Sequence, residues 1–152
     1  MSGIGSARAV ADLADGLVLA TVEVRAAPER VFRALASDEV CRWWVRPGVF
    51  DTRQWSGEVR PGGRWQASGI GGGKPYELEG EFIDVEAPRR LLHTWNLGGS
   101  PEATTTIEYI LEPAGDGTRV TLRQSRFSSP GACAATCLGW ETSFEELQRM
   151  LG

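Results

Sequence analysis

Hydrophobic and polar residues alternate in the first clearly patterned segment of the chain. Within residues 17–25, small apolar residues occupy every second position: Val18, Ala20, Val22 and Val24. This period of two predicts a half-buried β-strand. Residues 1–15 are rich in small residues and show no such pattern, so we expect them to form a loosely ordered N-terminal segment.

Two short helices are predicted after this strand. Pro28 opens the first, because proline is favoured in the first turn of a helix, where its missing N–H has no partner. Apolar residues then recur at helical spacing, which predicts a helix over residues 28–36. The Ser-Asp-Glu sequence at 37–39 is typical of the capped start of a second helix, which would continue through Trp44.

Turn-forming residues divide the stretch from Phe50 to Gln124 into short segments. Clusters of Gly and Pro separate six runs with β-type patterning, at residues 53–59, 64–68, 77–86, 91–97, 104–112 and 119–126. The intervals between these runs are too short for crossover helices. We therefore predict consecutive antiparallel strands.

The last segment carries an apolar stripe with helical spacing. Six residues separated by 4, 3, 4, 3 and 4 positions form it: Cys133, Cys137, Trp140, Phe144, Leu147 and Leu151. This spacing predicts a long C-terminal helix with one face against the sheet. The whole order predicts an α+β fold, in which a curved antiparallel sheet of about six to seven strands wraps around that helix. A space between sheet and helix would suit an apolar ligand.

Composition limits the classes of protein that this chain can belong to. With 152 residues and 41% hydrophobic residues, it is long enough for one domain with a real core. Sixteen basic against twenty acidic residues give a net charge of −4, which argues against a nucleic-acid partner. No apolar run approaches the roughly 20 residues that span a bilayer. Residues 1–16 carry two Asp and no long apolar core, so we expect no signal peptide and a cytoplasmic protein.

Few residues offer metal binding or covalent catalysis. Three Cys and one His, His93, provide neither a disulfide framework nor a usual zinc site. The single Lys, Lys74, lies in a glycine-rich turn, where the desolvation that activates a catalytic lysine is not expected. Cys133 and Cys137 share a helical face, and core packing is the more common role for such thiols. We therefore predict no metal, no cofactor and no catalytic residue.

Short motifs are spread in order along most of the chain: VRAAPERVFRAL at 24–35, Trp43-Trp44, RPGGRW at 60–65, GEFIDVEAPRRL at 80–91, Thr94-Trp95, GTRVTL at 117–122 and Gly139-Trp140. Together they resemble the SRPBCC (START-like) superfamily, in the branch related to the activator of the heat-shock-protein-90 ATPase. The resemblance implies a single START-like domain over residues 16–152, with a helix-grip fold and a cavity between sheet and helix. The superfamily contains lipid and hormone carriers, polyketide aromatases and cyclases, co-chaperone domains and enediyne self-sacrifice resistance proteins. These proteins share no catalytic residue, so the fold does not imply the function.

Aromatic residues are the most distinctive candidates for a ligand site. Nine side chains are predicted to line the cavity: Trp44, Phe50, Trp65, Phe82, His93, Trp95, Tyr109, Trp140 and Phe144. Rigid aromatic walls bind flat or apolar ligands, although core packing is the more common role of any one such residue. Strand parity places His93 and Trp95 on one face, with Tyr109 and Gln124 as further polar groups.

Binding without covalent chemistry is the function that these features favour. We expect a small hydrophobic molecule between sheet and helix, because the sequence contains no nucleophile–base pair and no metal cluster. Two alternatives stay open. One is a co-chaperone-like module that stimulates a chaperone ATPase of the heat-shock-protein-90 type. The other is a polyketide cyclase or aromatase, with His93 or Tyr109 as proton carrier, or a related self-sacrifice resistance protein.

Overall fold

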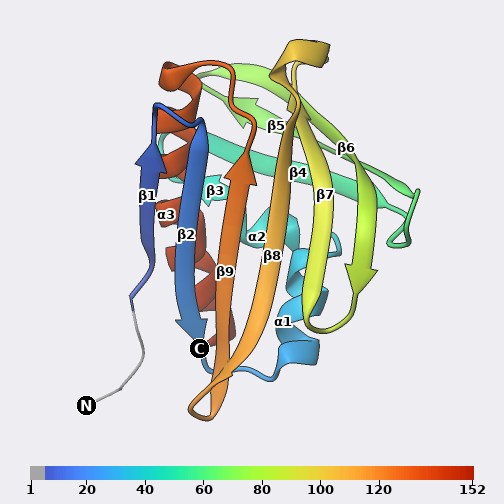
Figure 1. Ribbon diagram of the computed structural model, residues 1–152, viewed down its shortest axis with the longest axis vertical. Coiled ribbons are helices and arrows are strands. Elements are labelled where there is room, and N and C mark those ends of the chain that lie inside the picture. The colour runs from blue at the N-terminus through green and yellow to red at the C-terminus, as the bar shows by residue number, and fades with distance from the viewer. Residues whose placement is uncertain (1–5) are drawn as a thin grey trace.

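Hydrogen bonds between neighbouring strands join nine strands into one antiparallel sheet (Figure 1). The computed structural model describes residues 6–152, and in it the strand order is β1-β2-β9-β8-β7-β6-β5-β4-β3. The strands are β1 (Arg8–Asp12), β2 (Leu17–Val24), β3 (Val45–Arg46), β4 (Phe50–Gly57), β5 (Arg64–Gly71), β6 (Lys74–Glu86), β7 (Arg90–Leu97), β8 (Thr105–Ala114) and β9 (Gly117–Ser125). From β3 onward each strand pairs with the next along the chain, and β9 closes the order by pairing with β2.

One long helix fills the concave side of this sheet. The helices are α1 (Pro28–Leu35), α2 (Val40–Trp43), the short 3-10 helix η1 (Pro101–Ala103) and α3 (Pro130–Leu151). Ser129 caps α3 by accepting a hydrogen bond from the N–H of Ala132. In Figure 1, α3 lies behind the curled sheet, and it contacts β1 and β2 on one side and α2 and β3 on the other. The helix therefore bridges the two ends of the sheet, as in a helix-grip fold. None of the helices within residues 6–152 is long and apolar enough to cross a membrane.

The predicted apolar positions form the core. The four small residues of β2 that alternate along the strand are each at most 2% exposed. On α3, the residues of the predicted stripe are buried from Cys133 to Leu147, except that Cys137 is half-buried, as is Leu151 at the C-terminal end. The periods of two and 3.6 thus correctly identified which face of each element is buried.

Two strands were not predicted, and one of them lies in the segment that we expected to be loosely ordered. Residues 8–12 form β1, which pairs with β2 over five positions, so that expectation is wrong for them. The same expectation for residues 1–5 lies outside the described residues. The other addition is β3, which has only two residues. Both are edge strands, and pairing with an existing strand stabilises segments whose own pattern is too weak to predict them. The sheet therefore has nine strands and not six to seven.

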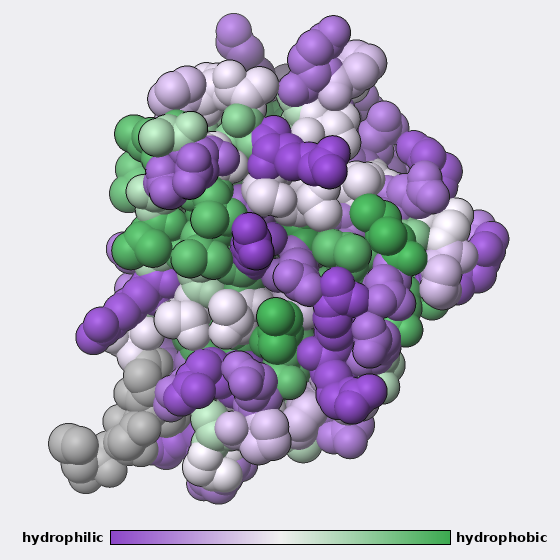
Figure 2. Space-filling model, in the orientation of Figure 1, coloured by the Kyte–Doolittle hydropathy of each residue, from purple (hydrophilic) through white to green (hydrophobic). Residues whose placement is uncertain are grey.

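The face of the molecule shown in Figure 2 is mostly hydrophilic, with a hydrophobic patch over β1 and β2 and smaller hydrophobic areas beside it. Val10 and Leu19, which are paired across these strands, are 63% and 42% exposed. The free edge of β1 is partly covered by α3, because the carboxylate of Glu141 accepts a hydrogen bond from the N–H of Ala9 at 3.2 Å. This contact occupies one of the donors that an exposed edge strand would offer to another chain.

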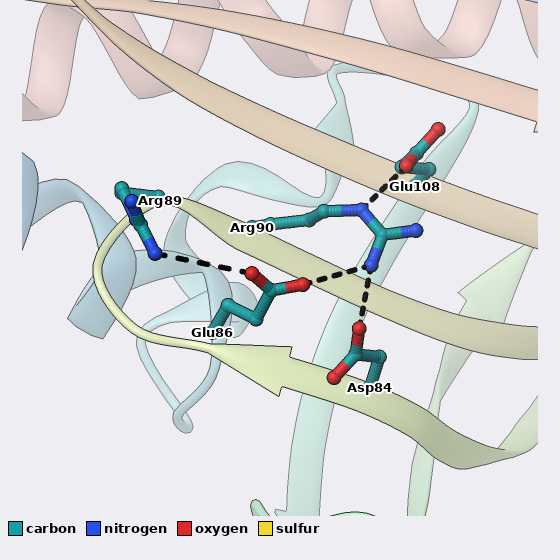
Figure 3. A network of polar contacts seen from close by, with 5 residues as sticks. All are labelled: Asp84, Glu86, Arg89, Arg90 and Glu108. Atoms are coloured by element: carbon teal, nitrogen blue, oxygen red, sulfur yellow. Dashed lines mark hydrogen bonds and ion pairs between the residues drawn. The ribbon is translucent and has the colours of Figure 1, made fainter.

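An arginine on the outer face joins three neighbouring strands. Arg90 of β7 donates from Nε to Glu108 of β8 at 2.6 Å, and from Nη1 to Asp84 and Glu86 of β6 at 2.6 and 3.1 Å (Figure 3). Its side chain is 31% exposed, so these contacts are only partly screened by water. A network of this kind stabilises more than an isolated exposed ion pair.

Replacing Arg90 by Ala is expected to lower the free energy of unfolding by about 1–2 kcal/mol, because three carboxylates then face one another without a cation. Urea denaturation at low salt measures this change. Arg60→Ala is the matched control, since Arg60 forms an exposed pair with Glu58 and its loss should cost less than about 0.5 kcal/mol. Equal effects for the two variants would show that the Arg90 network adds nothing beyond a surface pair.

Candidate functional site

Most of the predicted lining residues converge between the sheet and α3. Seven of the nine are at most 5% exposed: Trp44, Trp65, Phe82, His93, Tyr109, Trp140 and Phe144. The other two, Phe50 and Trp95, are half-buried at the margin. Trp43, at the end of α2, was not among the predicted residues, yet it is fully buried in the same place. These seven residues and Trp43 are called the interior aromatic cluster below.

Trp140 of α3 lies at the centre of the interior aromatic cluster. Its ring centre is 5.8 Å from that of Phe144 and 6.0 Å from that of Trp44. Trp43 and Tyr109 follow at 6.1 and 6.2 Å. These distances are those of aromatic rings in contact, and the contacts with Trp44 and Tyr109 are edge-to-face. Side chains thus occupy the space that the sequence predicted as a cavity.

Two hollows among the described residues lie outside this cluster. One, of about 570 Å³, covers β4, β5 and β6, and Gly98 and Gly99 lie at its margin. Polar side chains of Gln54, Gln66, Glu77 and others surround it. The second, of about 390 Å³, lies among charged residues of α1 and α2. Neither is lined by any residue of the interior aromatic cluster.

A chain of buried hydrogen bonds connects α3 to three strands. Trp140 Nε1 donates to Oε1 of Gln124 at 2.7 Å, and Nε2 of Gln124 donates to Oγ1 of Thr105 at 2.7 Å. Thr105 in turn donates to the carbonyl of Trp95 at 3.1 Å. Gln124, one of the predicted polar groups, therefore faces the interior, but its amide is engaged by protein partners.

Two other indoles of the cluster also have partners. Trp43 donates to the carbonyl of Ala34 at 2.9 Å, and Trp65 donates to the carbonyl of Thr94 at 3.2 Å. Gly80 permits the second contact, because a Cβ at this position would lie 2.4 Å from Nε1 of Trp65. Hydrogen bonds thus fix the orientation of these rings.

Polar atoms without partners remain inside the cluster. Trp44 Nε1 and the hydroxyl of Tyr109 are buried and have no partner at full hydrogen-bond geometry within the described part of the chain, and the same holds for Nε1 of Trp95. Burial raises the pKa of Tyr109, and the nearby Trp44 indole offsets part of this increase. The Tyr109 phenol is therefore protonated at neutral pH and is available as a donor.

His93 is neutral and has a defined tautomer. Its Nδ1 lies 2.8 Å from the carbonyl oxygen of Thr94, which can only accept, so Nδ1 carries the proton and Nε2 carries the lone pair. Burial lowers the pKa of His93 to about 4. The ring lies between Trp65 and Phe82, at centroid distances of 5.1 and 5.8 Å. All eight residues of the interior aromatic cluster are consequently uncharged at neutral pH.

The cysteines and carboxylates do not add a metal site. Within residues 6–152, no group of three His, Cys, Asp or Glu side chains is placed to hold a metal ion. Cys133 is buried and Cys137 half-buried, and desolvation raises the pKa of both thiols. These thiols are suited to packing rather than to nucleophilic attack.

A curled antiparallel sheet closed by a long helix over an aromatic interior defines a protein of the helix-grip class. The sequence model of the "Activator of Hsp90 ATPase homolog 1-like protein" family matches residues 25–152, and the chain belongs to that family. No curated protein sequence matches the chain.

Solved structures share this fold at low sequence identity. Protein Ms6760 from Mycobacterium smegmatis is similar with a TM-score of 0.81 and 18% identity, over 98% of this chain and 97% of that chain. CalU16 from Micromonospora echinospora is similar with a TM-score of 0.66 and 21% identity, over 97% and 84%. DynU16, a protein in the dynemicin biosynthetic locus, has a TM-score of 0.71 and 23% identity, and the match covers 90% of this chain and 47% of that one.

Stability is expected to fall between about pH 6.5 and pH 4 because of His93. Its pKa is about 6.5 when unfolded and about 4 when folded, so in this range the unfolded chain binds more protons. The contribution of neutral His93 is complete above the unfolded pKa and is lost as the pH falls. By about pH 5 the loss amounts to about 2 kcal/mol.

Urea unfolding of the wild type and of His93→Gln at about pH 7.5 and pH 5 measures this term. The carboxylates titrate in both proteins, and His93 is the only histidine, so the difference in pH dependence isolates it. Identical pH dependence in the two proteins would show that His93 is not buried as a neutral ring.

Gln124→Leu is expected to destabilise the protein by about 2–3 kcal/mol, because it leaves the buried Trp140 N–H without an acceptor and Thr105 without a donor. Measured in the background of Trp140→Phe, the same substitution should cost less, since the orphaned N–H is then absent. Gln66→Leu, at an exposed position of β5, is the matched control and should change stability by less than about 0.5 kcal/mol. Full additivity of the first two substitutions would mean that the hydrogen bond does not couple them.

Proposed function

We propose that the protein binds a small hydrophobic or aromatic molecule between the sheet and α3, without covalent chemistry on it. The observation that supports this most is the pair of buried donors, Trp44 Nε1 and the Tyr109 hydroxyl, that have no partner at full hydrogen-bond geometry within the described residues. Buried polar groups in folded proteins nearly always have a partner, and an unpaired group calls for a missing one. Family membership is consistent with this role, because the helix-grip fold encloses an interior suited to such ligands.

Binding requires that aromatic rings move, because they fill the interior. Phe50 and Trp95 are the two predicted lining residues that are only half-buried, and we expect the opening there. Phe50 lies beside Gly139 of α3, where no side chain stands between ring and helix. A ligand would thus select a conformation in which the margin is open, and its affinity is reduced by the free energy of that opening.

The protonation states favour binding over catalysis. A histidine with a pKa of about 4 is a weak base at neutral pH, and Tyr109 with a raised pKa is a weak acid. A cyclase or aromatase role would need one of them to carry a proton. The similarity to DynU16, from the dynemicin biosynthetic locus, keeps a natural-product ligand among the candidates for binding.

Thermal unfolding with a panel of uncharged aromatic molecules tests the proposal, together with native mass spectrometry of the purified protein. A ligand of the native state must raise the melting temperature. Phe144→Leu creates space at a ring that contacts Trp43 and Trp140, and is expected to strengthen binding at least several-fold.

Phe32→Leu on α1 is the control, because it creates comparable space at a buried ring that, within residues 6–152, stacks on none of the cluster's rings, and it should leave affinity unchanged. The proposal fails if no panel member raises the melting temperature of the wild type or of Phe144→Leu. It fails equally if both variants enhance binding to the same extent.

A second candidate is stimulation of a chaperone ATPase of the heat-shock-protein-90 type, favoured by the family to which the chain belongs. This role needs surface contacts and no open interior. Adding the protein to such a chaperone should then raise its rate of ATP hydrolysis. Phe144→Leu, which alters only buried surface, should stimulate as well as the wild type, whereas ligand binding should respond to it.

A further inference from the structure

We propose that the ligand of the interior aromatic cluster is an uncharged molecule with a carbonyl-type oxygen that accepts hydrogen bonds from both Trp44 Nε1 and the Tyr109 hydroxyl. This inference rests on the proposed function and adds the chemical class of the ligand. It also assigns ligand specificity to Trp44 and Tyr109, whose buried donors have no partner at full hydrogen-bond geometry within the described residues.

The two donors belong to rings that contact the same indole. Trp44 follows α2 and Tyr109 is in β8, and both rings contact Trp140, at 6.0 and 6.2 Å. The Trp44 indole is also near enough to the phenol to influence its ionisation. Neither atom has a partner at full hydrogen-bond geometry within the described residues, although the Trp44 N–H lies close enough to the phenol oxygen to lower the pKa of Tyr109 as a weak donor. A carbonyl oxygen has two lone pairs and accepts from two converging donors at once.

A third polar atom near the two donors, Nε2 of His93, is a hydrogen-bond acceptor. His93 carries its proton on Nδ1, so Nε2 offers a lone pair, and its ring centre is 5.9 Å from that of Tyr109. A ligand hydroxyl next to the carbonyl would therefore find an acceptor here. The set of polar atoms is two neutral donors and one neutral acceptor.

Electrostatics exclude charged ligands from the same place. The interior aromatic cluster contains no Arg or Lys, so a buried carboxylate would have no counter-charge. Burying an ammonium group meets the same obstacle, because no Asp or Glu is among the buried residues of the described part of the chain. Other indoles of the cluster, those of Trp43, Trp65 and Trp140, are already bonded to protein acceptors and cannot add donors.

Three probes of similar shape and different polarity test the inference: 1-indanone, indane and 1-indanecarboxylate. Titration calorimetry with the full chain is expected to show 1-indanone binding about tenfold or more tightly than indane, since one carbonyl satisfies two unpaired donors. The carboxylate should bind most weakly. Infrared spectroscopy should show the carbonyl stretch of bound 1-indanone shifted to lower frequency than in an apolar solvent.

Tyr109→Phe and Trp44→Phe should each lower the affinity ratio of 1-indanone to indane and reduce the infrared shift, and the double variant should bring the ratio close to one. Tyr76→Phe is the matched control, because the only other tyrosine hydroxyl contacts Thr52 and should leave the ratio unchanged. Removing the Tyr109 hydroxyl deletes an unpaired polar atom and is not expected to impair folding. The infrared shift in the wild type tests the inference even without these variants.

The outcomes separate this inference from the proposed function. If indane binds as tightly as 1-indanone, the assignment of the two donors is wrong while binding in the interior stands. The same holds if the affinity ratio of 1-indanone to indane is unchanged in Tyr109→Phe. An unshifted carbonyl stretch has the same meaning. If none of the three probes binds to the wild type or to Phe144→Leu, the inference and the proposed function fail together.

Discussion

The hydrogen bond between Trp140 and Gln124 is the contact on which the arrangement of sheet and helix depends. It joins the middle of α3 to β9 in a place where neither partner can find water. Breaking it would leave a buried donor and a buried acceptor, and the loss would exceed the modest net gain of an ordinary hydrogen bond. The bond also fixes the orientation of the indole around which the other rings pack, so the position of α3 and the packing of the interior aromatic cluster are set together.

The cost of breaking a buried hydrogen bond also explains why some rings of the cluster are fixed and others are free to rearrange. Trp43, Trp65 and Trp140 are held by hydrogen bonds to protein oxygens, and moving them would break these bonds. Trp44 and Tyr109 have no partner at full hydrogen-bond geometry within the described residues, so ring packing is what chiefly holds them. Rearranging them sacrifices ring contacts, each worth about 0.5–1.5 kcal/mol, but no hydrogen bond. A filled interior is therefore compatible with binding, provided that the entering molecule replaces these contacts.

Periodicity in the sequence predicted the fold well, because burial on one side of an element imposes a pattern on its residues. Val18 to Val24 on β2 and the stripe from Cys133 to Leu151 on α3 show this directly. The edge strands β1 and β3 escaped prediction for the opposite reason. Ala9 and Ala11 contrast little with their neighbours, and β3 is too short for any period. Such segments become strands because a neighbour supplies the hydrogen bonds.

The sequence predicted which residues lie in the candidate site, but not whether their rings leave a cavity. Strand parity and helical spacing indicated that His93, Tyr109 and Trp140 point inward, and the structure brings them together. Trp43 was missed because its neighbour Trp44 appeared equally suitable, and two consecutive residues of a short helix do not reveal which is more buried. Whether the rings leave a space depends on rotamers and distances across six elements, and no sequence pattern encodes these.

Neutrality of the interior limits the chemistry that this fold can perform here. Proton transfer needs a group that changes its charge near the working pH, and desolvation moves both candidates away from it, His93 downward and Tyr109 upward. A nearby carboxylate would raise the pKa of His93 again by stabilising the charged imidazolium. The hydrogen-bond partner of His93, however, is the backbone carbonyl of Thr94. That carbonyl orients the ring without making it a useful base. Binding a neutral molecule, as we propose, needs no group that changes its charge near neutral pH, and it is therefore compatible with these shifted pKa values.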